Sequence, residues 1–181
     1  MNNVLNLIGS QLLWLAAVGG AANDMAWLGP SAFLLFAGWQ LFPGRRAKGD
    51  VTLVLIALPL GLLVDSTMAA TGLARYASPG PIAWLAPMWI LTLWMGFALT
   101  FNHSLANLMR RSRWAVAFGA VAGPLSYWVA QRAWGAVEFA SPQWAPLLVL
   151  GVLWGVAMGL LALACKHYSA PQATLQSSVE H

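Results

Sequence analysis

Two groups of polar residues lie within otherwise apolar stretches of the chain, and their types could support binding or catalysis. Asp65 is the one carboxylate in the apolar stretch 51–73. Because a charge at the centre of a bilayer costs roughly 3 kcal/mol or more, this side chain is expected to face a partner, a cavity or the interior of a helical bundle. Near the end of another apolar stretch, His103 is flanked by Asn102 and Ser104. An imidazole there could act as a general acid or base on a lipid, assisted by these two neighbours.

The rise of an α-helix predicts the depth of each polar residue. Asp65 lies roughly 21 Å into its stretch, and Arg132, counted from Trp114, lies at roughly 27 Å on another helix, at a rise of about 1.5 Å per residue. This spacing predicts an ion pair, because a guanidinium can reach across one helical turn and compensate a carboxylate. His103 is counted from residue 82, where its helix starts at the membrane surface that is nearer to Asp65. At the same rise, His103 lies roughly 31 Å below that surface. We therefore expect no catalytic pair between Asp65 and His103.

The residues expected near the depth of Asp65 form a candidate ligand-binding set. They can be interpreted as a polar pocket for the headgroup of a ligand or as a buried structural ion pair, and the sequence alone leaves both open. The set is Asp65, Ser66, Tyr127, Gln131 and Arg132. A second group could converge at the opposite depth, and it comprises Asn6, Gln11, Gln40, Asn102, His103 and Asn107.

Sequence motifs of several enzyme classes are absent. The chain has no HExxH, paired carboxylates, nucleophile elbow, P-loop or GxGxxG, so hydrolase, zinc, di-iron and nucleotide mechanisms lack their ligands. The single Cys165 cannot form a disulfide within the chain, and we interpret it as a packing residue. His167 and His181 follow the last apolar stretch, which disfavours a haem with two histidine ligands. No metal and no cofactor are expected.

The composition is typical of a membrane protein. Of 181 residues, 60% are hydrophobic and 8% are charged, whereas soluble domains carry about 25% charged residues. The net charge of +4 does not indicate a nucleic-acid partner, because the basic residues occur in short clusters between apolar stretches. Membrane lipids are the expected surroundings of this chain.

Six stretches are long enough to be interpreted as membrane-spanning helices. The sequence therefore predicts an all-α fold, a single transmembrane bundle over residues 1–168, followed by a polar, disordered tail over residues 169–181 whose last three residues resemble a tag junction. The first stretch lacks the features of a cleaved signal peptide and is expected to be retained. The predicted spans are 4–22, 25–42, 51–73, 82–109, 114–129 and 144–165.

Charge and aromatic residues predict the orientation. With six spans, the larger basic clusters fall on one side, so both termini are expected in the cytoplasm. These clusters are Arg45, Arg46 and Lys48, then Arg110, Arg111 and Arg113, then Lys166. Tryptophans near span ends are interpreted as interfacial anchors, namely Trp27, Trp84, Trp114 and Trp144.

Small residues at four-residue spacing predict close helix contacts. Gly119 and Gly123 form one such pair, and the stripe 151–159 has three glycines at this spacing. The stripes could hold the bundle together, or form an interface with a second copy or a membrane partner. Gly61 and Ala69 make the Asp65 face of its helix small in the same way.

Several segments together resemble a known family. They are NLIGSQLLW, VDSTMAATG, PMWILTLWMGFALTFNHSL, AGPLSYW and RAWGAVEF. Over residues 3–166 the chain resembles a proteobacterial family of small inner-membrane proteins catalogued as a domain of unknown function. The resemblance implies a multi-pass protein of the bacterial inner membrane and places Asp65, Asn102, His103 and Ser104 in characteristic segments. It implies no activity.

Three hypotheses for the function follow from these residues. The first is a protein that binds or translocates a small or lipid-like molecule in a polar pocket near Asp65. The second is an intramembrane lipid-modifying enzyme that uses His103. The third is a structural subunit that contacts a partner through its glycine stripes. The sequence favours the first, because it contains one pocket candidate and no complete catalytic set.

Overall fold

Seven helices and one two-stranded sheet form residues 2–169, the part of the chain that the computed structural model describes. The predicted helical fold is confirmed. Ser169 ends the last helix, so the predicted tail otherwise lies outside the described residues. The elements are α1 Asn2–Ala22, α2 Leu28–Gln40, α3 Asp50–Ala70, β1 Ala74–Tyr76, α4 Met88–Ala98, α5 Ala106–Met109, α6 Ser112–Trp134, β2 Val137–Phe139 and α7 Trp144–Ser169.

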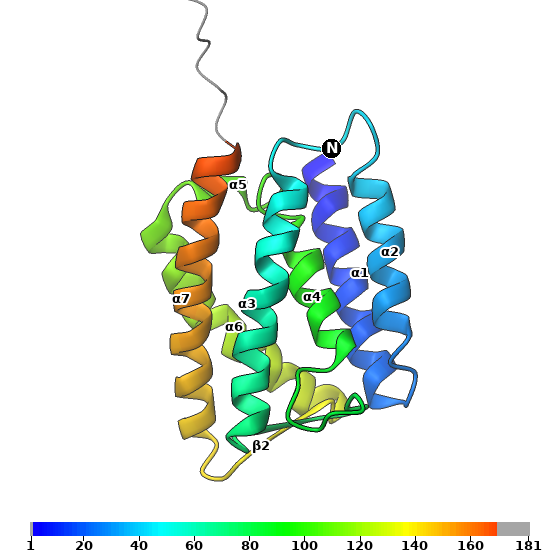
Figure 1. Cartoon of the computed structure of the whole chain (residues 1–181), viewed down its shortest axis with the longest axis vertical. Coiled ribbons are helices and arrows are strands. Elements are labelled where there is room, and N and C mark those ends of the chain that lie inside the picture. Colours follow the sequence, from blue (N-terminus) through cyan, green and yellow to red (C-terminus); the bar gives the residue numbers. More distant parts are fainter. Residues whose placement is uncertain (1, 170–181) are drawn as a thin grey trace, which may run out of the picture.

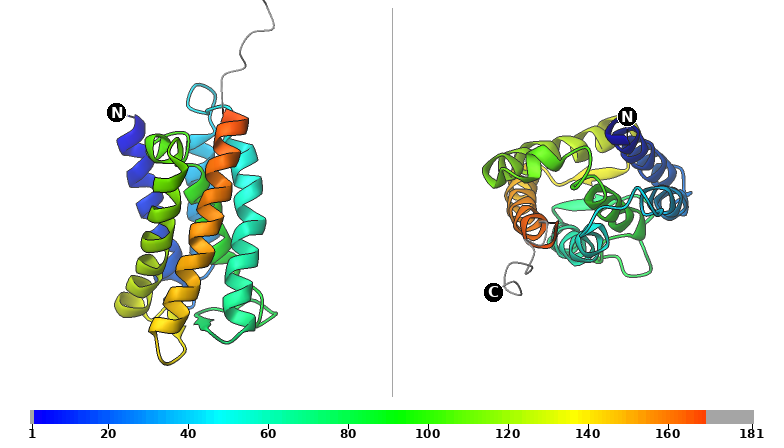
Figure 2. Two further views of the ribbon diagram at one scale, coloured as in Figure 1. Left: turned by 90° about the vertical axis from the view of Figure 1, so that its left-hand side faces the viewer. Right: turned by 90° about the horizontal axis from the view of Figure 1, so that it is seen from above.

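The long helices lie side by side, and successive helices run in opposite directions (Figure 1). The start of α1, the loop 41–49, α5 and the end of α7 gather at one end of the bundle, which we call the basic end. The two strands lie at the other end, which we call the sheet end. The three predicted basic clusters fall on segments of the basic end. The helix α6 runs obliquely, from α7 at the basic end towards α1 at the sheet end (Figures 1 and 2).

The prediction of one long helix over residues 82–109 is wrong. The helix α4 covers Met88–Ala98, because Pro87 precedes it in an extended conformation and fixes its start. After α4 the backbone forms successive turns: the Leu105 N–H donates to the Thr100 carbonyl at 2.9 Å, and the Thr100 hydroxyl donates to the Phe97 carbonyl at 2.6 Å. These local bonds replace the helical ladder and place residues 99–105 in a turn segment at the basic end.

The helix α6 is longer than the predicted span 114–129. Pro124 lies inside it, and the helix ends where Gly135 adopts φ +66°, a conformation that glycine accepts without strain. Immediately afterwards β2 pairs antiparallel with β1, so Arg75 lies opposite Glu138. This small sheet joins the segment after α3 to the segment after α6.

The glycine stripes lie where α6 packs on α7. A Cβ atom on Gly123 would collide with Trp154, and one on Gly151 would lie 2.9 Å from the Ala120 carbonyl oxygen. The two backbones can therefore approach only because these side chains are absent. The contact is within one chain, as the bundle interpretation of the stripes requires.

The outer surface of the bundle is apolar. Leu35 on α2 is 78% exposed, Val121 on α6 is 68% exposed, and Leu148 on α7 is 63% exposed. The helices α1, α3 and α7 are each long and apolar enough to cross a membrane. A soluble monomer rarely exposes so much apolar surface, so the fold is that of a membrane protein.

Candidate functional site

Asp65 is fully buried and accepts three hydrogen bonds. The Tyr76 and Tyr127 hydroxyls donate to Oδ1 at 2.9 Å and 2.7 Å, and the Trp94 indole Nε1 donates to Oδ2 at 2.7 Å. The donors come from β1, α6 and α4, whereas Asp65 belongs to α3. One carboxylate therefore connects four elements through hydrogen bonds.

The local structure explains how these donors reach Asp65. Gly61, one turn before Asp65 on α3, leaves room for the Trp94 ring. A Cβ atom at position 61 would overlap with this ring. The pairing of β1 with β2 buries Tyr76 against the end of α3. Burial, and then the charge of Asp65, raise the pKa of the Tyr76 phenol well above its ordinary value, so the phenol stays protonated as a donor.

The predicted pair of Asp65 with Arg132 is wrong. Arg132 is exposed, and its guanidinium carbon lies 5.7 Å from the centre of the Trp128 ring. The pair does not form because the two side chains lie on different faces of α6: Tyr127 points to the interior of the bundle, whereas Arg132 points to the outside. Ser66 accepts a bond from the Ala86 N–H at 3.0 Å instead of facing a pocket.

Of the predicted ligand-binding set, Tyr127 is the member that donates a side-chain hydrogen bond to Asp65. Gln131 is half-buried, and its side-chain oxygen has no partner among the described residues. Trp94 and Tyr76 are not among the predicted residues. Trp94 is an aromatic side chain in an apolar stretch, where nothing indicates that its polar atom is used, and Tyr76 lies in the loop after the Asp65 stretch. A buried carboxylate near several Trp and Tyr residues is the signal that could have found them.

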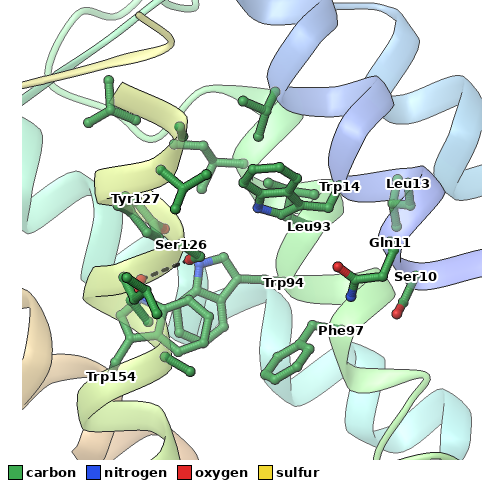
Figure 3. Close-up of a pocket in the computed structure, with 18 of the residues that line it drawn as sticks. Ser10, Gln11, Leu13, Trp14, Leu93, Trp94, Phe97, Ser126, Tyr127 and Trp154 are labelled. Atoms are coloured by element: carbon green, nitrogen blue, oxygen red, sulfur yellow. Dashed lines mark hydrogen bonds between the residues drawn. The ribbon is translucent and has the colours of Figure 1, made fainter. Parts of the chain in front are cut away.

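A cavity of about 430 Å³ lies directly beside this cluster, between α1, α4, α6 and α7. We call it the aromatic cavity. Trp94 and Tyr127 belong to its wall, so the polar atoms that hold Asp65 and the rings that line the cavity are parts of the same side chains (Figure 3). The aromatic side chains lining it are Trp14, Trp89, Trp94, Phe97, Phe118, Tyr127 and Trp154.

The wall of the aromatic cavity is well packed. The Trp94 and Trp154 rings stack at 4.2 Å between centroids, and Tyr127 meets Trp154 edge to face at 6.2 Å. A few polar side chains also line the cavity, among them Gln11 and Ser126. The predicted polar pocket is thus replaced by a mainly aromatic one, with Asp65 behind its wall.

A second polar cluster lies at the basic end. His103 Nε2 lies 2.9 Å from Oδ2 of Asp50, which is fully buried, and the Asn102 amide donates to Oδ1 of Asp50 at 2.8 Å. The Gln40 amide nitrogen lies 3.0 Å from the same imidazole nitrogen, and the Gln40 amide oxygen accepts a bond from the Asn6 amide at 2.7 Å.

This cluster confirms part of the predicted convergence. Asn6, Gln40, Asn102 and His103 come together, and the Ser104 hydroxyl donates to Asn6 at 2.7 Å. Two predicted members are elsewhere: Gln11 lines the aromatic cavity, and Asn107 is exposed and bonded by Arg110. Asp50 is not among the predicted residues, because it closely follows the basic residues of a loop, where a carboxylate is ordinarily exposed.

The two clusters are separate. Asp50 and Asp65 lie on the same helix, roughly 22 Å apart along its axis at a rise of about 1.5 Å per residue. As expected, Asp65 and His103 do not contact each other: Asp65 is bonded by Tyr76, Trp94 and Tyr127, and His103 contacts Asp50.

Fold and site together define a helical membrane protein whose core contains a carboxylate held by aromatic donors beside an aromatic cavity. The chain belongs to the family described as "Protein of unknown function (DUF2878)", whose model matches residues 3–160. No curated protein and no solved structure matches the chain. The resemblance stated from the sequence is confirmed for a family of unknown function, and its proteobacterial origin stays a prediction.

Proposed function

We propose that this protein binds or translocates a small apolar or lipid-like molecule in the aromatic cavity. The observation that carries the proposal is the cavity itself, about 430 Å³ of space walled by seven aromatic side chains. Ligand pockets of this size are mostly apolar and contain a few placed polar groups. Gln11 and Ser126 supply such groups here.

The access route supports a ligand that arrives from the bilayer. Phe118 and Leu125 on α6 both line the cavity and are exposed, as is Gln11 on α1. The cavity therefore opens sideways between α1 and α6, and the oblique course of α6 separates these two helices towards the basic end (Figure 1). Close to the sheet end, Trp14 and Trp134 meet edge to face at 5.5 Å and close the gap.

We further propose that the chain crosses the bacterial inner membrane six times, with both termini in the cytoplasm. The helices α1, α2, α3, α4, α6 and α7 would make the crossings, with residues 99–105 extending the short α4. The gathering of the basic clusters at one end supports this orientation. The four predicted anchor tryptophans are all exposed and lie close to helix ends, as interfacial residues would.

Filling the cavity tests the proposed function. Ala122→Trp places an indole in the cavity wall, whereas Val121→Trp places the same side chain on the apolar outer surface, where Val121 is 68% exposed. With a diazirine-bearing fatty acid as probe, we expect crosslinks in the wild type and Val121→Trp on cavity-lining peptides of α1, α4 and α6. In Ala122→Trp these crosslinks should fall at least tenfold. Equal crosslinking in both variants, with unchanged melting temperatures, would exclude the cavity as the site.

A further inference from the structure

Gln11 is a polar residue in the middle of the apolar helix α1, and its side chain lines the aromatic cavity. The helix runs from Asn2 to Ala22, so at a rise of about 1.5 Å per residue Gln11 lies roughly 14 Å from one end and roughly 17 Å from the other. With α1 crossing the membrane, these distances place the amide near the middle of a hydrocarbon core about 30 Å thick.

The Gln11 amide has no hydrogen-bond partner in the part of the chain that the structure describes, and it projects from α1 into the cavity (Figure 3). The two serines of the wall are already bonded. The Ser10 hydroxyl donates to the Leu7 carbonyl at 2.8 Å, and the Ser126 hydroxyl donates to the Gly123 carbonyl at 2.8 Å. Because no water reaches the middle of a bilayer, an unpaired amide there is costly. A ligand that pairs with Gln11 would remove this cost.

The Trp14 indole supplies a second donor on the same helix. Trp14 follows Gln11 by three residues, so the two side chains lie on the same face of α1, and both line the cavity. Among the described residues Nε1 of Trp14 has no acceptor and is not a buried atom. Trp94 and Tyr127, in contrast, donate their polar hydrogens to Asp65. An oxygen atom of a ligand can therefore accept hydrogen bonds from this face of α1.

The charge of the wall indicates that the head of the ligand is neutral. No charged side chain is among the described residues that line the cavity. Behind the wall, the Asp65 carboxylate would repel an anion. A phosphate or carboxylate group in the cavity would thus lose its hydration without gaining a countercharge.

The shape of the wall favours a planar head. The Trp94 and Trp154 rings stack at 4.2 Å between centroids, and aromatic side chains make up much of the remaining surface. A planar ring binds such a wall well, because rings attract one another in stacked and edge-to-face arrangements. The sideways opening between α1 and α6 leaves a path for a hydrocarbon chain into the bilayer.

We propose that the ligand of the aromatic cavity is an uncharged quinone lipid. A ring carbonyl accepts a hydrogen bond from the Gln11 amide, the planar ring stacks on the aromatic wall, and the apolar chain extends through the opening between α1 and α6. A quinone has oxygen acceptors without charge, so its head can lie near the middle of the bilayer. This inference deepens the proposed function and rests on it.

A competition experiment tests the ligand class. Full-length protein in phosphatidylcholine nanodiscs is crosslinked with the diazirine-bearing fatty acid in the presence of decylbenzoquinone or decylbenzene. Both competitors carry the same chain on a planar ring, but only the quinone has carbonyl oxygens. Counted per lipid, the quinone should halve the crosslinking of the wild type at a concentration about tenfold lower than decylbenzene, because its hydrogen bond adds affinity.

Two matched variants test the role of the amide. Gln11→Leu keeps a side chain of similar size and removes the amide, and Gln11 is exposed, so the fold should be retained. The two competitors should then be about equally effective. Gln143→Leu makes the same change just before α7, outside the cavity, and should keep the tenfold advantage of the quinone.

The outcomes separate this inference from the proposed function. Equal competition by the two compounds in the wild type would overturn the quinone proposal, whether or not the variants fold, and would leave the cavity as an apolar binding site. A tenfold advantage that persists in Gln11→Leu would also overturn it. Absence of fatty-acid crosslinks from the wild-type cavity would instead overturn the proposed function, and this inference with it.

Discussion

Asp65 shows how neutral side chains stabilise a carboxylate inside a membrane protein. Two phenols and one indole surround it, and each gives a hydrogen bond without adding a charge. A guanidinium would have brought a second ion into the bundle, which has its own desolvation cost. The arrangement also aligns the rings of Trp94 and Tyr127 along the aromatic cavity, so the position of the carboxylate and the shape of the cavity depend on one another.

The three tyrosines of the chain provide a matched test of this cluster. Tyr76→Phe and Tyr127→Phe each remove one donor to Asp65, and each should lower stability by about 1–2 kcal/mol. Tyr168→Phe removes the hydroxyl of a residue that is 43% exposed at the end of α7, and it should be neutral. Thermal melting in detergent compares the three variants. Equal melting temperatures for all three would show that the phenols do not stabilise the buried carboxylate.

At the level of single residues, the sequence predicted which polar residues matter better than it predicted their partners. Asp65 and His103 stand out because charge and imidazole are rare in apolar stretches. Their partners Trp94 and Asp50 were missed for opposite reasons, since Trp94 is one of eleven tryptophans and Asp50 lies in a charged loop. Partner choice depends on helix rotation and on loop closure, which residue spacing alone does not determine.

At the level of elements, helix ends decide where the sites form. Composition predicts apolar stretches well, but it does not reveal that α4 ends at Ala98, because residues 99–101 are as apolar as the helix before them. The turn segment 99–105 is what carries His103 to Asp50. The two strands are three residues long and pair across sixty residues of chain, a contact too short and too distant to leave a sequence pattern.

Gly61 provides an element-level prediction about the α3–α4 contact. Gly61→Ala adds a methyl group where the Trp94 ring lies, so it should displace the indole from Asp65 and cost about 1–3 kcal/mol. Gly38→Ala on α2 is the control, because a Cβ atom there meets nothing within 4 Å and alanine favours the helix by roughly 0.5–1 kcal/mol. Opposite shifts of the melting temperature are expected. A Gly61→Ala variant as stable as wild type would show that this contact is loose.

At the level of the whole molecule, the distribution of charge over the two ends predicts the orientation. The basic end gathers arginines and lysines from three separate segments, while the sheet end carries Arg75 opposite Glu138 at 4.0 Å, with both side chains largely exposed. An exposed pair of this kind contributes little to stability, but it leaves the sheet end with no local excess of positive charge from these two residues. Positive charge in excess on one side is what retains that side in the cytoplasm.

Single-cysteine labelling tests this orientation in a Cys165→Ser background. Serine can replace the Cys165 thiol as the donor to Asn102, so the background should fold. Cysteines replacing Arg46 and Arg111 should react with a membrane-impermeant maleimide only after the cytoplasmic side is opened, whereas cysteines replacing Arg75 and Glu138 should react in intact spheroplasts. Because α3 alone separates Arg46 from Arg75, labelling of these two positions from the same side would show that α3 does not cross the membrane, and the six-crossing topology would be wrong.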